Sequence, residues 1–285
     1  MKVLLSGILL FFFVKVPVWA QVKNPATDSK PFVLGVVEEL SSEVLAEKRI
    51  LNIYLPEGYA ADDTTHYPVI YLLDGSADED FIHVVGLVQF NTFPWIARVP
   101  KSIVVGIANV DRRRDFTYPT SVPEDKKRFP STGQSGTFMT FLEKELQPFI
   151  NKKYRTTASR LLIGQSLGGL LATEILFKKP QLFDKYVIIS PSLWWDNGSL
   201  LSQVPAALPA VQVYIGVGKE GLTPSQVPRV MEVDANLLAD KLNAVKHQHG
   251  KVYFDYLPQE DHATITHQAV FNALRLLYPV SEAGK

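Results

Sequence analysis

The sequence predicts an α/β fold with a mostly parallel central sheet, helices on both faces and an antiparallel pair of strands at the start. Short runs rich in Val, Ile, Leu and Tyr recur along the chain, and segments with one apolar helical face separate the later runs. This alternation is typical of parallel strands that are buried on both faces. Hydrophobic residues make up 46% of the 285 residues and charged residues 20%, which suffices for a sizeable core.

Eight apolar runs are the predicted strands. We expect the first two to form the antiparallel pair and the later ones to be parallel, because helical segments connect them. In chain order the runs are Val33–Leu40, Arg49–Leu55, Pro68–Leu73, Ser102–Ala108, Arg160–Gly164, Lys185–Ser190, Val211–Val217 and Lys251–Leu257.

Three helices are predicted from apolar residues that recur at helical spacing. We interpret each stripe as a face packed on the sheet. The stripes are Phe138, Phe141, Leu142, Leu146, Phe149 and Ile150; Val233, Leu237, Leu238, Leu242 and Val245; and Ile265, Ala269, Val270, Leu274 and Leu277.

The N-terminus has the order of a secretory signal: a positive charge, an apolar run and then small residues. The run Val3–Val14 is interrupted at Lys15 and is shorter than the roughly 20 residues that a spanning helix requires, so a membrane anchor is the weaker interpretation. We expect cleavage after Ala20, a periplasmic or secreted location and no stable membrane insertion of the mature chain. Residues 21–31 then form a flexible lead-in, and residues 32–280 form a single domain.

Charge and cysteine content exclude several classes of function. Lys and Arg together number 29, as do Asp and Glu, so the chain lacks the positive charge that non-specific nucleic-acid binding requires. Cysteine is absent, which excludes disulfides, Cys-based zinc sites and thiol nucleophiles. We expect neither a cofactor nor a metal, and a small-molecule partner.

The strongest motif is Gly164-Gln165-Ser166-Leu167-Gly168, which joins an apolar strand directly to an apolar helix. This context predicts a nucleophile elbow, a strained turn that exposes the serine hydroxyl above the strand ends. Such a pentapeptide also occurs by chance in loops, but the readable strand and helix on either side favour the elbow.

A serine hydroxyl needs a base to remove its proton and an acid to orient that base. In enzymes with such an elbow the chain order is Ser, acid, His. His262 lies in the loop after the last predicted strand and is the expected base, with His267 in the following helix as the alternative. The expected acid is Glu220, in the loop after the preceding strand, and Asp234 is its competitor.

An oxyanion hole requires two backbone N–H donors. Leu167, which follows the nucleophile, is expected to supply one. The second should come from the loop after the third strand, where Ser76 and Gly75 are the candidates.

Two groups of side chains are expected to face the substrate, because they follow strands at the carboxyl edge of the sheet. Arg112 and Arg114 could hold an anionic oxygen, although at least one Arg of the run 112–114 should be merely solvated. Trp194 and Trp195 could stack on an aromatic group, and core packing would explain one of them equally well.

Six segments in order resemble the esterase family of the α/β-hydrolase superfamily. They are Leu72-Leu73-Asp74-Gly75, Arg112-Arg113-Arg114-Asp115-Phe116, Gly164-Gln165-Ser166-Leu167-Gly168-Gly169, Ser190-Pro191-Ser192-Leu193-Trp194-Trp195, Gly218-Lys219-Glu220 and Glu260-Asp261-His262. The family includes siderophore trilactone esterases, feruloyl and acetylxylan esterases and S-formylglutathione hydrolases. Many hydrolases have His-Gly where this chain has Asp74-Gly75.

The resemblance implies an α/β-hydrolase fold and a serine carboxylic-ester hydrolase that acts through an acyl-serine intermediate. Siderophore lactones or aryl esters are the expected substrates. Acyl transfer by the same fold is an alternative, and a non-catalytic binding protein is a weaker one because Ser, His and an acid are all present.

Overall fold

The computed structural model describes residues 29–60, 64–225, 227–247 and 250–279. The chain divides into two units, Met1–Val33 and Leu34–Lys285, and residues 29–33 of the first have no regular secondary structure. The predicted signal segment and its cleavage site lie outside the described residues. Within the described ranges, no helix has the length and apolar character needed to cross a membrane.

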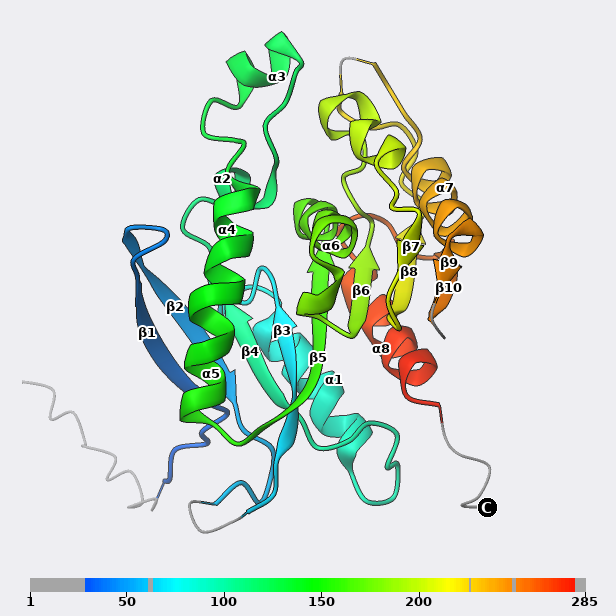
Figure 1. The fold of residues 1–285 in the computed structure, drawn as a ribbon. Helices are drawn as coiled ribbons and strands as arrows, with labels where there is room; N and C mark the ends of the chain where they lie inside the picture. Colours follow the sequence, from blue (N-terminus) through cyan, green and yellow to red (C-terminus); the bar gives the residue numbers. More distant parts are fainter. Residues whose placement is uncertain (1–28, 61–63, 226, 248–249, 280–285) are drawn as a thin grey trace, which may run out of the picture. The chain divides into compact units, whose positions relative to one another are not determined.

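The second unit is built on an eight-stranded sheet with the spatial order β1-β2-β4-β3-β5-β6-β8-β10 (Figure 1). β1 is antiparallel to β2, β2 is antiparallel to β4, and all the other neighbours are parallel. The predicted fold class is therefore confirmed. The strands are β1 (Val36–Ser42), β2 (Glu47–Tyr54), β3 (Tyr67–Leu72), β4 (Ile103–Ile107), β5 (Thr156–Gln165), β6 (Lys185–Ile189), β8 (Gln212–Gly218) and β10 (Lys251–Leu257). β7 (Ala207–Leu208) and β9 (Lys246–His247) form a separate pair.

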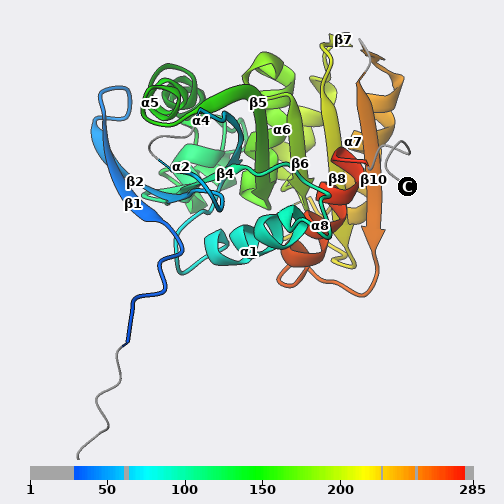
Figure 2. The same cartoon turned by 90° about the horizontal axis from the view of Figure 1, so that it is seen from below.

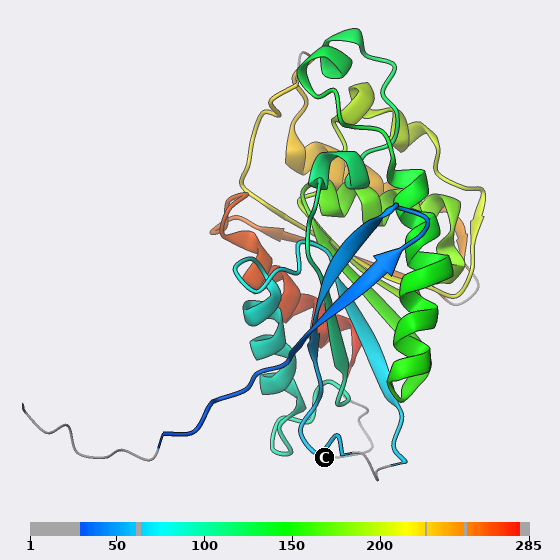
Figure 3. The same cartoon turned by 90° about the vertical axis from the view of Figure 1, so that its left-hand side faces the viewer.

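Helices cover both faces of the sheet, as Figures 2 and 3 show. One face packs against α1 (Phe81–Thr92) and α8 (Ile265–Leu277). The other packs against α4 (Ser135–Phe141), the π-helical turn η1 (Leu142–Leu146), α5 (Gln147–Lys153), α6 (Leu167–Lys178) and α7 (Met231–Ala244). Successive residues of each strand point to opposite faces, which is why the parallel strands are apolar throughout.

Shorter helices lie in the connections near the carboxyl ends of the parallel strands. α2 (Arg112–Phe116) follows β4, and the turn η3 (Trp195–Ser202) follows β6. α3 (Pro123–Arg128) lies between α2 and α4, and η2 (Pro180–Leu182) lies between α6 and β6. The loops that carry α2 and η3 bring side chains to the edge of the sheet where ligands bind in folds of this class.

Three details differ from the sequence prediction. β1 starts at Val36 rather than Val33, and as an edge strand it leaves the side chains of Val36 and Val37 exposed. Val233 was expected in the buried stripe of α7 but is 60% exposed, because the helix begins at Met231 and its buried face runs through Ala235 and Leu238. α1 was not predicted at all.

Candidate active site

The elbow serine occupies a strained backbone conformation between β5 and α6. Ser166 has φ 60° and ψ −118°, a region that side-chain-bearing residues rarely adopt. A Cβ on Gly164 would lie 2.4 Å from the carbonyl oxygen of Gly168, so only glycine permits this close crossing of strand and helix. Gly169 matters equally, since its Cβ would lie 2.9 Å from the carbonyl oxygen of Ile189 on β6.

Three side chains from three separate loops form a continuous hydrogen-bond chain. Ser166 Oγ lies 3.0 Å from Nε2 of His262, in the loop between β10 and α8. His262 Nδ1 lies 2.6 Å from Oε2 of Glu220, in the loop after β8. The arrangement leaves one imidazole nitrogen to accept the serine proton while the other donates to a carboxylate.

The carboxylate of Glu220 is buried and well supplied with donors. Its side chain is 3% exposed. Oε1 accepts hydrogen bonds from the hydroxyl of Ser190 and, at 3.3 Å, from the backbone N–H of Gly218. Burial alone would raise the pKa of Glu220, but the hydrogen bonds from His262, Ser190 and Gly218 outweigh it and hold the pKa below its ordinary value. The carboxylate is therefore kept ionised.

The alternative acid and base have other partners. Asp234 accepts both Nε and Nη2 of Arg229, at 2.6 and 2.5 Å, in a two-point ion pair. His267 lies on α8 with its ring 6.3 Å from that of His83. Neither residue belongs to the hydrogen-bond chain of Ser166.

The oxyanion-hole candidates differ in their availability. Leu167 is the first residue of α6, and within the described part of the chain its N–H donates to no backbone oxygen, as helix geometry requires. The N–H of Gly75 donates to the carbonyl oxygen of Ile107 at 3.0 Å, so it is already occupied. Ser76 is then the candidate of that loop whose N–H has no backbone acceptor among the described residues.

Arg112 is tied to the backbone directly before the nucleophile. Its Nη2 donates to the carbonyl oxygen of Gln165 at 3.2 Å, and its Nε and Nη2 pair with the two oxygens of Asp74 at 2.6 and 2.9 Å. Gln165 in turn donates through Nε2 to the carbonyl oxygen of His262 at 2.7 Å. The departure from His-Gly at Asp74 thus provides an anchor for Arg112 beside the serine.

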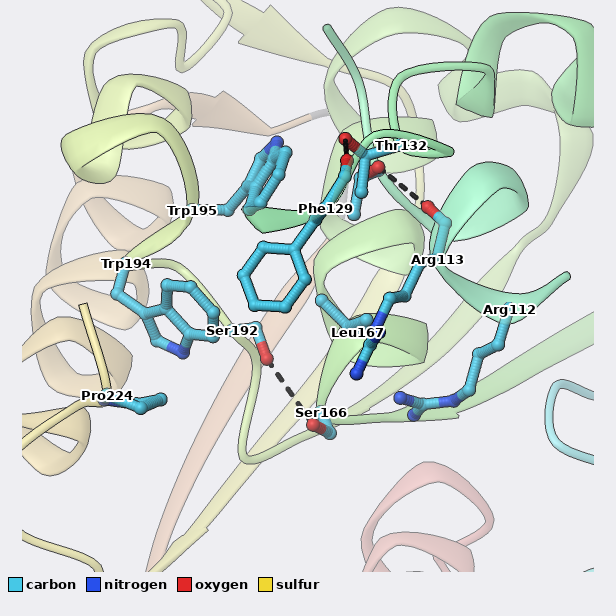
Figure 4. A pocket seen from close by; sticks show the side chains of 11 residues that line it. Arg112, Arg113, Phe129, Thr132, Ser166, Leu167, Ser192, Trp194, Trp195 and Pro224 are labelled. Carbon is cyan, nitrogen blue, oxygen red and sulfur yellow. Dashed lines mark hydrogen bonds between the residues drawn. The ribbon is translucent and has the colours of Figure 1, made fainter. Parts of the chain in front are cut away.

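A hollow of about 250 Å³ opens beside Ser166, and we name it the acyl-side hollow (Figure 4). The guanidinium of Arg113 lies 4.8 Å from the ring centre of Phe129, a distance typical of a cation–π contact. Trp194 lies across the hollow from the arginines (Figure 4). Its lining residues are Arg112, Arg113, Thr117, Phe129, Thr132, Ser166, Leu167, Ser192, Trp194, Trp195 and Pro224.

The structure separates the predicted substrate-facing residues. Arg112, Trp194 and Trp195 line the hollow, although Trp195 is only 1% exposed and its indole N–H donates to the carbonyl oxygen of Tyr118. Arg114 is directed elsewhere: it pairs with both oxygens of Glu47 on β2 and with Asp115. Arg113 lines the hollow instead.

Two serines that sequence reasoning missed also contact the site. Ser190 donates to Glu220, and Ser192 Oγ lies 3.3 Å from Ser166 Oγ. The signal was present in the run Ser190-Pro191-Ser192, which leaves a buried strand beside the elbow strand. Within the described ranges, no group of three or more His, Cys, Asp or Glu is arranged to hold a metal ion.

The strained serine, the imidazole and the buried carboxylate on this sheet define a serine hydrolase with the α/β-hydrolase fold. A family model described as "Putative esterase" matches residues 42–269. The chain belongs to that esterase family.

Relatives in two comparisons agree with this assignment. The chain is similar to ferri-bacillibactin esterase BesA of Bacillus subtilis, with 32% identity over 170 residues, which cover 55% of this chain and 58% of that protein. It is also similar to a siderophore enterobactin esterase of Emericella nidulans, with 37% identity over 92 residues, covering 31% of this chain and 30% of that one. The matched segments thus span about a third to three-fifths of these relatives.

Solved structures are similar over more of the chain. An IroE-like serine hydrolase from Shewanella oneidensis has a TM-score of 0.77 and 33% identity, covering 86% of this chain and 80% of that one. The BES protein from Bacillus cereus has a TM-score of 0.73 and 28% identity, covering 89% and 99%.

Proposed function

We propose that this protein hydrolyses carboxylic esters through an acyl-serine intermediate, with Ser166 as nucleophile, His262 as base and Glu220 as the orienting acid. The observation that carries the proposal is the unbroken chain from Ser166 Oγ to His262 at 3.0 Å and from His262 to Glu220 at 2.6 Å. Serine, imidazole and carboxylate in this order supply the three roles that acyl transfer to a hydroxyl requires.

In acylation, Ser166 Oγ attacks the ester carbonyl carbon while its proton passes to Nε2 of His262. The C=O electron pair moves onto the oxygen, where the N–H groups of Leu167 and Ser76 stabilise the negative charge. The ester C–O bond then breaks, and His262 gives the proton to the departing alcohol oxygen. Glu220 stabilises the imidazolium throughout, and its lowered pKa keeps it charged for this task.

In deacylation, water replaces the alcohol. His262 removes a proton from the water, the hydroxide attacks the acyl carbon, and the bond to Ser166 Oγ breaks as His262 returns the proton to that oxygen. The product acid is released and the free serine is restored.

The acyl-side hollow supports an acyl part that carries an anionic aromatic group. Arg112 and Arg113 supply positive charge, while Phe129 and Trp194 supply aromatic faces. Catecholate-bearing siderophore lactones have this chemistry, and the printed names of BesA and the enterobactin esterase point to the same substrates. We propose siderophore lactone as the lead substrate class, ahead of plant cell-wall aryl esters and simple acyl esters.

The test is an assay of the purified protein on these three ester classes, compared by kcat/KM. The proposal predicts the highest value for the catecholate lactone. A preference for short neutral acyl esters would contradict the substrate class and leave ester hydrolysis intact.

We also propose that the protein is exported and processed after Ala20, in the periplasm or outside the cell. The support is the charge and apolar pattern of residues 1–20. N-terminal sequencing should give Gln21 or a residue close to it, whereas Met1 on a membrane-bound form would contradict export with cleavage.

A further inference from the structure

We propose that a second hollow beside Ser166 binds the alcohol part of the ester, and that it accepts a small, uncharged, apolar alcohol. The inference rests on the proposed ester hydrolysis and adds the side of the substrate that leaves. We name this feature the alcohol-side hollow.

The alcohol-side hollow has a volume of about 250 Å³ and shares Ser166 with the acyl-side hollow. Its far wall comes from the segment after β8, where Leu222 bridges to Val230 just before α7 begins at Met231. Trp194 stands between the two hollows and lines both. The lining residues are Ser166, Ser192, Trp194, Glu220, Leu222, Thr223, Pro224, Met231 and His262.

The position of His262 decides which part of the ester each hollow receives. When the ester C–O bond breaks, the proton on Nε2 must reach the alcohol oxygen, so that oxygen lies within hydrogen-bond distance of Nε2. The acyl substituent is bonded to the same carbon and extends to another side. His262 lines the alcohol-side hollow and is absent from the lining of the acyl-side hollow, whereas Leu167, an oxyanion donor, lines the latter.

The walls of the alcohol-side hollow fix the chemistry of the alcohol. Trp194, Leu222, Pro224 and Met231 present apolar surface. Its polar side chains already have partners: Glu220 binds His262, and Thr223 Oγ1 pairs with the hydroxyl of Ser225 at 2.7 Å and accepts an N–H at 2.9 Å. A charged alcohol would lose its hydration without gaining a partner, while an aliphatic or small aryl alcohol would gain by burial.

A third hollow also contacts His262, but its chemistry is different. It is lined by Asp74, Glu79, Asp80, Arg112, Gln165, Ser166 and His262. Arg112 is paired with Asp74, and Gln165 donates to the backbone of His262. This acidic hollow offers an apolar alcohol nothing to bury against, and it would suit a cationic alcohol instead. The experiment therefore includes an ester of that kind.

The test uses two ester series and one exposed residue. Leu222 is 71% exposed, so Leu222→Asp places a charge at the alcohol-side hollow with little risk to folding. Methyl to butyl acetate vary the alcohol, and ethyl acetate to ethyl butanoate vary the acyl group. A charge that alters His262 changes both series equally and cancels when the two slopes are compared.

For the wild type, kcat/KM should rise about two- to fourfold for each methylene added to the alcohol. Leu222→Asp should abolish that rise and keep the acyl slope, and Phe129→Ala should do the reverse. Val233→Asp, the same change at a residue that is 60% exposed on α7, should match the wild type in both series.

The assignment is wrong if Leu222→Asp keeps the wild-type alcohol slope or flattens the acyl slope instead. It is also wrong if choline acetate is preferred over butyl acetate and Glu79→Gln removes that preference, because the acidic hollow would then hold the alcohol. A wild type that cleaves none of these esters, and that a fluorophosphonate does not label, would contradict the proposed function itself.

Discussion

Glu220 meets His262 at 2.6 Å although the two residues lie in loops after different strands. The contact exists because β8 and β10 are adjacent and parallel, with Gly218 in register with Leu257, so that their carboxyl ends deliver both loops to one place. A Cβ on Gly218 would lie 2.6 Å from the carbonyl oxygen of Glu260, which shows how closely the loops approach. Acid and base are thus positioned by the sheet itself.

Glu220→Gln should lower kcat about 100- to 10,000-fold. The amide keeps the size of the side chain but loses the charge that stabilises the imidazolium of His262. Steady-state kinetics on any accepted ester measures the effect, with circular dichroism to check folding. The effect should also be non-additive with that of His262→Ala, since without the base the acid has nothing to orient.

The matched control is Asp234→Asn, the competing acid from the sequence. Asp234 is paired with Arg229, so this variant should lower the melting temperature while kcat stays within about threefold of wild type. An inactive, folded Asp234→Asn beside an active Glu220→Gln would reverse the assignment of the acid.

Stability should depend on Glu220 in acid. Its pKa in the folded protein is lowered, so the stability gained from the ionised carboxylate is complete above the unfolded value of about 4.3 and is lost as pH falls through the folded pKa. The difference in melting temperature between wild type and Glu220→Gln should therefore be constant from pH 7 to about 5 and shrink below about 4. A difference that grows as the pH falls would contradict the lowered pKa.

Arg113→Gln should reduce the preference for anionic acyl groups. We expect kcat/KM for an ester with a phenolate or carboxylate on its acyl part to fall about three- to tenfold relative to a neutral ester of the same size. Arg114→Gln is the control, because its partners are Glu47 and Asp115, and it should lower the melting temperature while keeping the preference. Equal loss of preference in both variants would mean that total charge, rather than the position of Arg113, is decisive.

Gly164→Ala should destabilise the protein by about 1–3 kcal/mol, because the new Cβ would meet the carbonyl oxygen of Gly168 at 2.4 Å. Gly86→Ala on α1 is the control, since a Cβ there has nothing within 4 Å, and it should stabilise by about 0.4–1 kcal/mol. Thermal or urea unfolding measures both. A Gly164→Ala protein as stable as the wild type would mean that the elbow can relax.

Sequence reasoning recovers the parts of the site that follow from chain order. Ser166 is revealed by glycines that only a tight turn needs, and His262 and Glu220 follow because each loop comes after a buried strand. The same logic cannot orient side chains within α2. Consecutive residues of a helix point about 100° apart, so which arginine of the run 112–114 reaches the substrate depends on Glu47, which lies far away in sequence.

Other features depend on contacts that no local pattern encodes. Ser190 and Ser192 become important only because β6 is the neighbour of β5 in space. Gly75 seems equivalent to Ser76 in sequence, yet its N–H is occupied by Ile107 of the adjacent strand. α1 escaped prediction because apolar residues surround most of its circumference, which blurs the helical period.

The most direct test of the account is the site of covalent labelling by a fluorophosphonate, read by peptide mass spectrometry. The account predicts one modified peptide, with the phosphonyl group on Ser166, no labelling of Ser166→Ala, and a loss of several orders of magnitude in kcat for that variant. Labelling at Ser192 or elsewhere, or an active Ser166→Ala protein, would contradict the central claim that Ser166 is the nucleophile.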